Sequence, residues 1–467
     1  MSTVLPGPFR RWGPGTLLAL LVSAAAAGTG VALTALASLF GTAAPLVLVG
    51  LAVFPLLLIG ILQEPLAGVA TVFATFPAGT LAIPAGLLSL QAPEAAVIMV
   101  AIVVILRRLA AAATPLPWAP SLWWLLGLLG WSVLAAPSAL DTSLALKSVA
   151  SLAGGIAFLC VVLDACRDLT DVRRAMAALT LIATGIAAYA LLTGGEARAL
   201  YGGTIISGRI EGTFTQPNQL GSFAGLSAFV AAGLALGARS PAGRVFAGIA
   251  LAIQLGALLF SLSRGAWIGT VIGMGFLILT LPQARRAVAV LSVPLVLIAA
   301  AVGAFAPTNP QVEVVGARIA SLTDVGPYDS RTTVWNEAVR EIQEDPWTGQ
   351  GPGNFPVASA RAASESRTVS ADHAHNLLLN WAAEAGLPAA GLIVGFSVAL
   401  ALTGRKAKRG LPPADRPLVA CLGAALLSLV GQGLVDYTLP VVPIFLTVMA
   451  VTGMMLACRR ISLAPAS

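Results

Sequence analysis

The histidines of this chain are concentrated at one point. Its 467 residues include only two, His373 and His375, both in the segment ADHAHNLLLNWAAEAG. Histidine is the side chain whose ordinary pKa suits proton transfer near neutral pH. If Asn376 opens a helix, His375 lies at the helix N-terminus, where the dipole disfavours a positive charge and favours the neutral form that a general base needs. The alternative without chemistry is an interfacial histidine bonded to backbone.

Polar residues continue into the helix that follows the histidines. Asn376, Asn380 and Glu384 recur every four residues, which places them on one face of a helix. At 1.5 Å per residue they extend roughly 12 Å into the bilayer. Polar groups at that depth face the protein interior or a wet cavity. We therefore expect them to support the histidines, and hydrogen bonding between helices is the alternative.

Two arginines lie close to expected membrane spans, where a charged side chain is unfavourable unless an interaction stabilises it. Arg264 lies in LGALLFSLSRGAWIGTVIGMGF, with apolar sequence on both sides, so we expect it at a tight hairpin between two spans, with Ser263 capping the second helix. An arginine deep in a span costs at least about 2.5–3.5 kcal/mol, so it requires an anionic partner, a ligand or a route to the interface. Arg209 lies in GRIEGTFTQPNQ, and pairing with Glu211 is its alternative role.

A third arginine, Arg331, begins the run RTTVWNEAVREIQEDP. Apolar Val334, Ala338 and Ile342 follow at four-residue spacing, and the pattern stops before Pro346. This spacing predicts an amphipathic helix on the membrane surface or over a cavity. Its alternative role is a packing lid without chemistry.

The three arginines and the histidines fall on the same side of the expected membrane topology. Guanidinium forks match phosphate oxygens, so arginines are well suited to hold a diphosphate. We expect Arg209, Arg264 and Arg331 to bind the diphosphate of a lipid-linked donor while a histidine activates an acceptor hydroxyl. Two histidines without a cysteine or acidic ligand cluster make a poor metal site, and we expect neither a metal nor a cofactor.

The composition fixes what kind of element can position these residues. Apolar residues make up 57% of the chain and charged residues 10%, against about 25% charged residues in soluble proteins. A soluble domain, a disulfide-rich secreted protein and a nucleic-acid-binding protein are excluded. We expect a single integral-membrane domain over residues 1–467, an all-α bundle of about 12–14 spans. The expected spans are near 16–38, 43–62, 66–89, 95–106, 119–136, 144–165, 175–193, 218–238, 245–262, 265–281, 287–306, 376–402, 417–434 and 438–457.

The basic residues predict the orientation of the bundle. With the N-terminus in the cytoplasm, about two thirds of the 27 Lys and Arg residues fall inside, as the positive-inside rule requires. Both termini are then cytoplasmic, and two longer outer segments remain, near 194–217 and 307–375. None of the four cysteines lies in an outer loop, and we expect them to be reduced.

At these motifs the sequence resembles the O-antigen ligase family, which groups WaaL-like ligases with Wzy-type polysaccharide polymerases. The resemblance covers residues 207–389. It rests on GRIEGTFTQPNQLG, SLSRGAWIG, the R-x₃-W helix leading to P-x₂-G-x-G, and HAHN followed by E-x-G. The ligase pattern H-[NSQ]-x₉-G-x-x-[GTY] fits at His375, Asn376 and Gly386 and departs at Ala389, which leaves ligase and polymerase open.

The resemblance implies a membrane glycosyltransferase of GT-C-type architecture in the bacterial inner membrane. It would move glycan from undecaprenyl diphosphate to lipid A–core or a polysaccharide at the periplasmic face, by an inverting reaction without metal. His375 matches the catalytic histidine of the family, and Arg209 and Arg264 match its diphosphate-binding arginines. Arg331 as a further anion contact, His373 as a helper, and Asn376, Asn380 and Glu384 as supporting residues are additions from the residues themselves.

Three other functions remain open on the sequence. A Wzy-type polymerase and a protein O-oligosaccharyltransferase differ from a ligase in the acceptor. A transporter of lipid-linked glycan belongs to another class, and it would favour internal repeats with ionisable residues in both halves. The sequence has no clear repeat of this kind.

Overall fold

The computed structural model describes most of the chain, and what it describes is a bundle of helices. The described residues are 57–80, 82–85, 88–110, 117–195, 197–201, 204–286, 331–365 and 370–463. Within them the only strands form two short hairpins. The expected spans 16–38 and 287–306, most of 43–62, and the first part of the outer segment 307–375 lie outside the described residues.

The first half of the described chain contains helices and one short strand hairpin. In order these are α3 (Pro65–Ala74), η3 (Phe76–Ala78), β1 (Ala82–Ala85), β2 (Leu88–Gln91), α4 (Ala92–Ala110), α5 (Leu122–Ala135), η4 (Ala136–Ser138), α6 (Thr142–Ala165) and α7 (Leu169–Thr193). A side-chain cap sets the start of two of them. Asp141 accepts the amides of Ser143 and Leu144 before α6, and Asp168 does the same before α7.

One expected span is wrong. Residues 66–89 were expected to be a span broken at Pro77 and Pro84, but α3 ends at Ala74 and an antiparallel β1–β2 hairpin follows, pairing Ala82 with Gln91. The prolines explain why no helix continues through this segment. Pro77 lies in the short η3 turn and Pro84 lies in β1, and a proline removes an amide donor and clashes with the preceding helical turn.

The second half contains the long helices of the bundle. In order the elements are β3 (Ala197–Tyr201), β4 (Thr204–Arg209), α8 (Pro217–Leu236), α9 (Pro241–Phe260), α10 (Arg264–Thr280), α13 (Arg331–Glu344), α14 (Phe355–Ser364), α15 (Leu377–Gly410), α16 (Arg416–Gly433) and α17 (Val442–Ile461). Among the described residues, 7 helices are long and apolar enough to cross a membrane. The expected all-α polytopic membrane bundle is confirmed.

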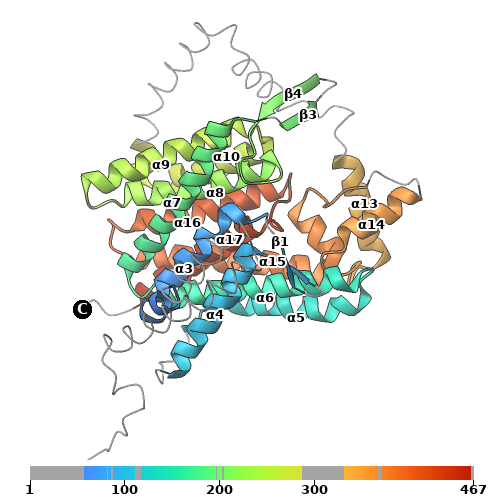
Figure 1. Ribbon diagram of the computed structural model, residues 1–467, viewed down its shortest axis with the longest axis horizontal. Helices are drawn as coiled ribbons and strands as arrows, with labels where there is room; N and C mark the ends of the chain where they lie inside the picture. The colour runs from blue at the N-terminus through green and yellow to red at the C-terminus, as the bar shows by residue number, and fades with distance from the viewer. Residues whose placement is uncertain are drawn as a thin grey trace, which may run out of the picture.

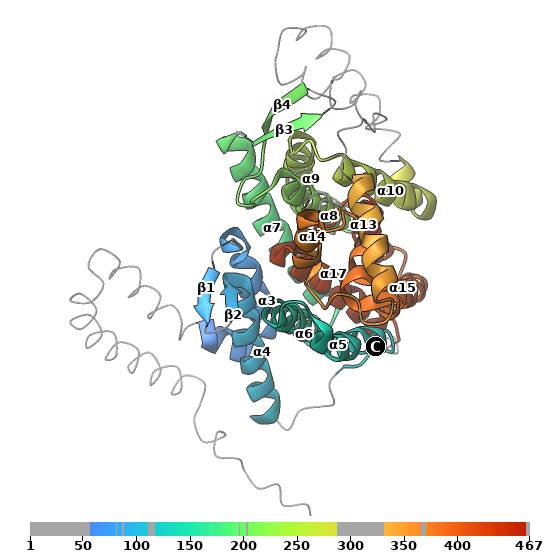
Figure 2. The same ribbon diagram turned by 90° about the vertical axis from the view of Figure 1, so that its right-hand side faces the viewer.

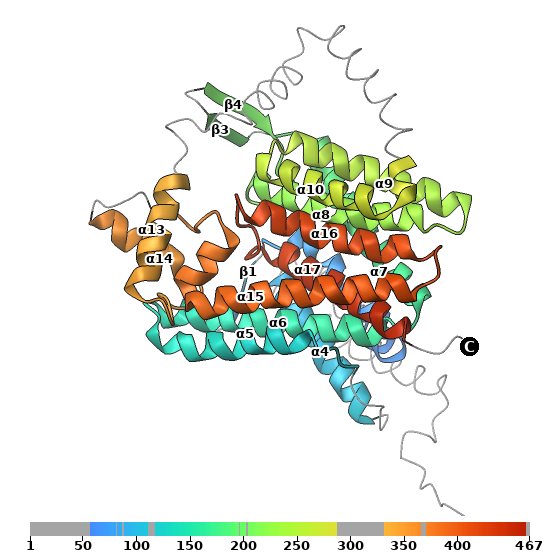
Figure 3. The same ribbon diagram turned by 180° about the vertical axis from the view of Figure 1, so that it is seen from behind.

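The helices share one direction, and the polar elements gather at one end. In Figure 3, α10, α16, α15 and α6 run roughly parallel to one another across the bundle. The outer helices α13 and α14 lie beyond one end of it, on the same side as the β3–β4 hairpin (Figure 1). Viewed along the bundle, α13 and α14 lie in front of the helix ends (Figure 2). The N-terminus of α15 therefore opens toward these outer elements.

Glycines bring α10 against α16. Gly265, Gly269 and Gly273 repeat every four residues and form one face of α10. A Cβ atom on Gly269 would lie 2.2 Å from the carbonyl oxygen of Ser428, and one on Gly273 would lie 2.8 Å from that of Ala424. Small residues at this spacing let membrane helices approach until their backbones touch. The contact fixes the start of α10 beside the end of α16.

A break in α15 holds the outer elements to the bundle. The helix is interrupted at Ala385 and Gly386, where the φ of Gly386 is 78°. The freed backbone groups are paired with neighbouring residues, as they must be in a membrane protein. Leu387 N donates to the carbonyl of Pro346 at 2.9 Å, and the Trp131 indole donates to that of Ala385 at 2.8 Å. The turn that follows α13 therefore docks at this break.

The surface helix and the cysteines agree with the sequence. Helix α13 runs over Arg331–Glu344 and buries Val334 and Ala338, while Ile342 is partly buried in the same cluster. The cysteines Cys160, Cys166, Cys421 and Cys458 are all free.

Substitution of Gly269 tests the close contact between α10 and α16. Gly269→Leu places a side chain against the backbone of α16, so the two helices must separate. Overpacking of a core typically costs about 1–3 kcal/mol, and we expect at least that loss because backbone rather than a side chain must move. Thermal unfolding of purified protein in one detergent measures it. Gly275→Leu is the matched control, since nothing lies within 4 Å of a Cβ atom there; equal melting temperatures for both variants would contradict the prediction.

Candidate functional site

A buried carboxylate lies at the centre of the polar end of the bundle. Asp436 follows the end of α16 and is 2% exposed. Its Oδ1 atom accepts the backbone amide of Tyr437 at 2.9 Å and lies 3.1 Å from Nδ1 of His375, while its Oδ2 atom accepts Nδ2 of Asn218 at 2.9 Å. Buried carboxylates are stable only with such partners. Asp436 therefore ties α8, α16 and the residues before α15 together.

His375 is held in a fixed orientation against this carboxylate. Asn376 caps α15 by accepting the amides of Leu378 and Leu379, so the expected helix start is confirmed. His375 has a φ of 51°, in the left-handed region that is strained for a residue with a side chain. Its side chain is 28% exposed, against 3% for Asp436. The imidazole thus reaches from the buried carboxylate toward solvent.

The ionisation of Asp436 sets the tautomer of His375. Burial alone would raise the pKa of Asp436, but the hydrogen bond and charge of His375, with smaller effects of His373 and Arg331, lower it below its ordinary value. An ionised carboxylate only accepts hydrogen bonds. In neutral His375 the proton is then on Nδ1, and Nε2 carries the lone pair. A lone pair on the exposed side of the ring is what a general base requires.

Arg209 is joined to the same network through one amide side chain. Arg209 is 5% exposed; its Nε atom donates to the carbonyl of Ser261 at 3.0 Å, and its Nη2 atom donates to Oδ1 of Asn218 at 2.6 Å. Asn218, at the second position of α8, in turn donates to Asp436. The alternative role, an ion pair with Glu211, is not seen among the described residues, and the guanidinium instead contacts Asn218.

Arg264 and Arg331 each begin a helix beside this network. Ser263 caps α10 by accepting the amide of Ala266 at 3.4 Å, as expected. A Cβ atom on the next residue, Gly265, would lie 3.4 Å from the Cβ atom of Asp436, so the start of α10 packs against the side chain of Asp436. The charge of Arg331 reaches Asp436 and helps to lower its pKa. A helix N-terminus with an arginine favours an anion.

His373 lies next to His375 in a different environment. The two rings meet edge to face, with centroids 4.3 Å apart, and the ring of Tyr437 is 6.0 Å from that of His373. Burial, followed by the charge of His375, lowers the pKa of His373. Its Nδ1 atom is buried and has no hydrogen-bond partner among the described residues. The ring is therefore neutral and retains a polar atom that a bound group can satisfy.

The polar stripe on α15 holds backbone in place. Asn376 Nδ2 donates to the carbonyl of Leu434 at 3.0 Å, and Asn380 Oδ1 accepts the amide of Ala374 at 2.9 Å. Glu384 Oε2 accepts the amide of Gly353 at 3.0 Å. Of the three, Asn380 and Asn376 fix the segment that carries both histidines, and Glu384 fixes the turn before α14. These contacts correspond to the hydrogen-bonding alternative for the stripe.

A polar cavity opens beside the network. It has a volume of about 350 Å³, and its wall includes Asn218, Gln219, His373, Asp436 and Tyr437. This volume falls within the roughly 300–1,000 Å³ of typical ligand sites. The cavity is therefore large enough to bring part of a substrate next to Asp436 and His373.

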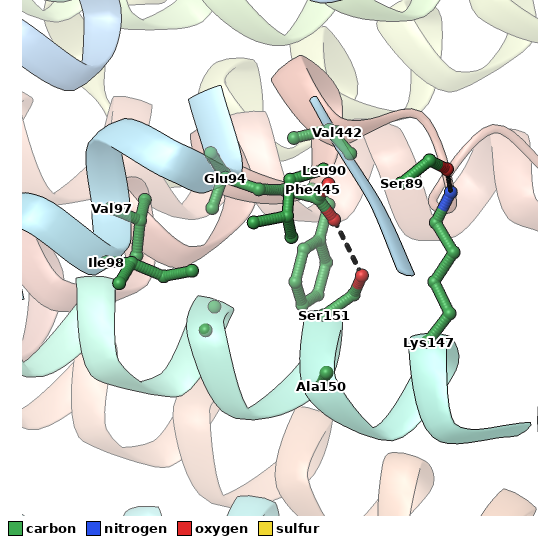
Figure 4. Close-up of a pocket in the computed structure, with 13 residues that line it drawn as sticks. Ser89, Leu90, Glu94, Val97, Ile98, Lys147, Ala150, Ser151, Val442 and Phe445 are labelled. Carbon is green, nitrogen blue, oxygen red and sulfur yellow. Dashed lines mark hydrogen bonds between the residues drawn. The ribbon is translucent and has the colours of Figure 1, made fainter. Parts of the chain in front are cut away.

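A smaller cavity lies elsewhere in the bundle, and polar side chains in its wall are paired with one another. Its volume is about 70 Å³, and it lies between α4, β2 and α6. Glu94 accepts the hydroxyl of Ser151 at 2.7 Å, and Lys147 donates to Ser89 at 3.2 Å (Figure 4). The charged groups are thus used to join neighbouring elements.

Three of the site residues could ligate a metal ion. His373, His375 and Asp436 offer ligand atoms that all lie within 4.8 Å of one another. The sequence did not reveal this group, because its acidic member lies 61 residues from His375. Two features disfavour a divalent cation at this position. Asp436 already accepts three hydrogen bonds, and the side chain of Asn218 links it to the guanidinium of Arg209. The number of possible ligands therefore suits a metal ion, but the positive charge of Arg209 nearby disfavours one.

Two residues of the network were missed in the sequence, and both carry a signal. Asp436 lies in GLVDYTLP between the last two expected spans, where an isolated acid at a membrane boundary marks an interaction that offsets its cost. Asn218 was read only as part of a motif at the start of a span. Nothing in the local sequence shows that the two meet, because their contact joins residues 218 positions apart.

Fold and site together define a multi-pass membrane protein with a polar site at one end of its helix bundle. Residues 249–394 match the family model described as O-antigen ligase. Over these residues the chain is similar to the O-antigen ligase family. The matched segment contains Arg264, Arg331 and His375 and begins after Arg209.

Other comparisons add little. No curated protein is similar enough to match. One solved chain, from the structure described as "Structural coordination of polymerization and crosslinking by a peptidoglycan synthase complex", is 16% identical, with a TM-score of 0.44. The similarity covers 74% of this chain and all of the other, and at this level it carries no argument.

Two buried glutamates on α13 make the outer cover sensitive to pH. Glu337 and Glu341 are each 1% exposed. Burial, with repulsion from Glu337, raises the pKa of Glu341 from 4.5 to about 8. Between these two values the folded protein retains a proton that the unfolded chain releases, so stability falls as pH rises through this range and is fully present below pH 4.5.

The substitution Glu341→Gln tests this dependence. Glutamine is neutral at every pH, so we expect the variant to melt higher than the parent at pH 8.5 and close to it at pH 5, with a gap of several degrees. Thermal unfolding at the two pH values measures it. Glu344→Gln, on the exposed side of the same helix, is the control and should change little with pH. Parallel melting curves for parent and Glu341→Gln would contradict the buried, protonated state.

Proposed function

We propose that the protein is an inverting membrane glycosyltransferase of GT-C-type architecture. It transfers a glycan from undecaprenyl diphosphate to an acceptor hydroxyl, with lipid A–core as the first candidate acceptor and a growing polysaccharide as the second. The observation that carries the proposal is the continuous set of contacts from Arg209 through Asn218 and Asp436 to His375. A group that binds an anion and a group that accepts a proton are held by one carboxylate.

The site supports a single displacement at the anomeric carbon. His375 Nε2 takes the proton of the acceptor hydroxyl as the acceptor oxygen attacks. The bond from the anomeric carbon to the diphosphate oxygen breaks on the opposite face, which inverts the configuration. Asp436 stabilises the imidazolium that forms, in the way a buried carboxylate assists a histidine base. The proton is then released from His375 to solvent, since the ring is partly exposed.

The arginines support the departure of the diphosphate. Arg209 is held in a fixed orientation by hydrogen bonds to Ser261 and Asn218, so the guanidinium needs little reorganisation when an anion binds. Arg264 adds a guanidinium at the N-terminus of α10, where the helix dipole also favours negative charge. Arg331 adds a third from α13. Fixed donors of this kind stabilise a leaving group more strongly than water does.

The membrane placement follows from the basic residues. We propose that both termini lie in the cytoplasm of a bacterium and that the site opens to the periplasm from the inner membrane. Lys408 and Arg409, in the last turn of α15, then face the cytoplasm, while His375 precedes the first turn. The donor and the acceptor would both reach the site from the outer leaflet.

Transfer by purified protein tests the proposal. The protein is mixed with a glycan on undecaprenyl diphosphate, and lipid A–core, free polysaccharide chain and a serine-containing peptide are offered in parallel. We expect transfer to lipid A–core, and His375→Ala and Asp436→Asn should each reduce the rate by about 10²–10⁴-fold, the range for a general base. Arg209→Lys should also reduce it, since lysine keeps the charge and loses the fork. Undiminished transfer by His375→Ala, with the parent's melting temperature, would refute the assignment.

Removal of metal ions tests whether the transfer depends on a metal bound by His373, His375 and Asp436. We expect transfer to be unchanged after dialysis against EDTA, because Asp436 and His375 are occupied by each other and lie among arginines. The rate is compared before dialysis, after it, and after adding Mg²⁺, Mn²⁺ or Zn²⁺. A loss restored by one of these ions would show instead that His373, His375 and Asp436 act as ligands.

A further inference from the structure

A large apolar groove runs along α15, from Leu377 and Trp381 at its start to Lys408 and Arg409 at its end. Its volume is about 600 Å³, and it lies between α15, α16 and α17, with α10 and α5 contributing to its wall. The wall is formed by large apolar side chains. Among them are Phe276, Phe396, Leu400, Leu426, Phe445 and Met455. Such a groove in a membrane protein takes an apolar chain, since a dry space of this size forfeits packing on all of its sides.

The end of the groove farthest from His375 is basic. Arg405, Lys408 and Arg409 line it. Lys408 is half-buried, and its Nζ atom donates to the carbonyl of Thr280, the last residue of α10, at 2.9 Å. Arg405 and Arg409 are exposed. Three cations therefore line one end of an apolar space.

The acids near this end are already used by other residues. Asp415 pairs with Arg173, and with Arg239 at 3.6 Å. Asp164 pairs with Arg108. Over the part of the chain that the structure describes, no carboxylate forms an ion pair with Arg405, Lys408 or Arg409. A negative charge supplied from outside the chain would complement them.

We propose that this groove is a binding site for an anionic phospholipid, with an acyl chain along α15 and the phosphate headgroup at Arg405, Lys408 and Arg409. Basic pockets between membrane helices are known to hold such headgroups. Arginines at a helix end also extend toward the interface without any ligand. Here the cations instead line one end of a groove of about 600 Å³, which binding of a lipid tail would fill.

This lipid is distinct from the proposed glycan donor. From Trp381 near the histidines to Arg405, α15 extends roughly 35 Å at 1.5 Å per residue, about the thickness of the hydrocarbon core. The donor diphosphate belongs at the His375 end and the phospholipid headgroup at the opposite end, so the two enter from opposite leaflets. The proposal does not depend on the proposed function. A bound lipid would join α15 to α16 and α17 across the groove and stabilise the bundle.

Lipid retention by the full-length protein tests the site. Purified protein in a neutral detergent is mixed with phosphatidylglycerol or with phosphatidylcholine of the same acyl chains. Native mass spectrometry then measures the bound lipid, and thermal unfolding measures stabilisation. We expect phosphatidylglycerol to bind at least tenfold more tightly and to raise the melting temperature. Equal binding of the two lipids would overturn the anionic site.

Three variants separate the headgroup contacts from the groove. Combined Arg405→Gln, Lys408→Gln and Arg409→Gln should weaken phosphatidylglycerol binding roughly a hundredfold, at about fivefold for each cation near an anionic headgroup. Ala401→Trp fills the groove, keeps all three cations, and should also weaken binding at least tenfold. Lys406→Gln is the control, because Lys406 is exposed in the same turn and does not line the groove. It should bind as the parent does.

The variants also define how the proposal fails. Unchanged binding in the triple variant would exclude the cations. Unchanged binding in Ala401→Trp, with loss in the triple variant, would mean attraction to surface charge rather than a groove. A photo-crosslinker at Ala401 that captures residues 287–306 of the chain, and not added phosphatidylglycerol, would mean that the protein itself fills the space. Each of these results would overturn the lipid site.

Discussion

One buried carboxylate determines how the polar end of this bundle is arranged. Asp436 is almost completely removed from solvent and is paired with Asn218, His375 and its own following amide. A carboxylate in such a place is strongly destabilising without these partners. Its requirement for hydrogen bonds therefore draws together the start of α8, the end of α16 and the residues before α15. The close contact of α10 with α16, made possible by Gly269, places the start of α10 beside the same group.

The remaining polar residues of the site support this arrangement through hydrogen bonds to the backbone. Asn376 and Asn380 hold the strained segment that contains His375, and Glu384 anchors the outer turn at Gly353. The break at Gly386 lets that turn dock against α15 with its backbone groups satisfied. The outer elements and the membrane helices are thus one structure at this end. The proposed base is oriented by backbone contacts that no single helix could provide, and its reacting nitrogen remains accessible.

The sequence predicted most of the helices and the members of the site, but not the interactions that join them. Composition and spacing were sufficient for the membrane bundle, the caps at Ser263 and Asn376, and helix α13. At residues 66–89 the break at Pro77 and Pro84 was expected, but the hairpin was not, because the positions of prolines do not show which strands pair. Asp436 was missed for a different reason. Its partners lie far away in the sequence, and only tertiary packing shows that an isolated acid at a span boundary faces a histidine. The polar stripe was recognised, while its contacts with backbone could not be read from periodicity.

The proposed mechanism requires a diphosphate to bind at Arg209 and an acceptor hydroxyl to bind at His375, the two ends of one hydrogen-bonded network. The most direct measurement is an experimental structure of the protein with undecaprenyl diphosphate bound. We predict that the diphosphate lies between the guanidinium groups of Arg209 and Arg264, and that the hydrogen bond between Asp436 and His375 is intact. Between the terminal oxygen of the diphosphate and Nε2 of His375 there should be room, in line, for the transferred sugar and the acceptor hydroxyl. A diphosphate bound at another part of the bundle, or a His375 ring turned away from it and released from Asp436, would contradict the account.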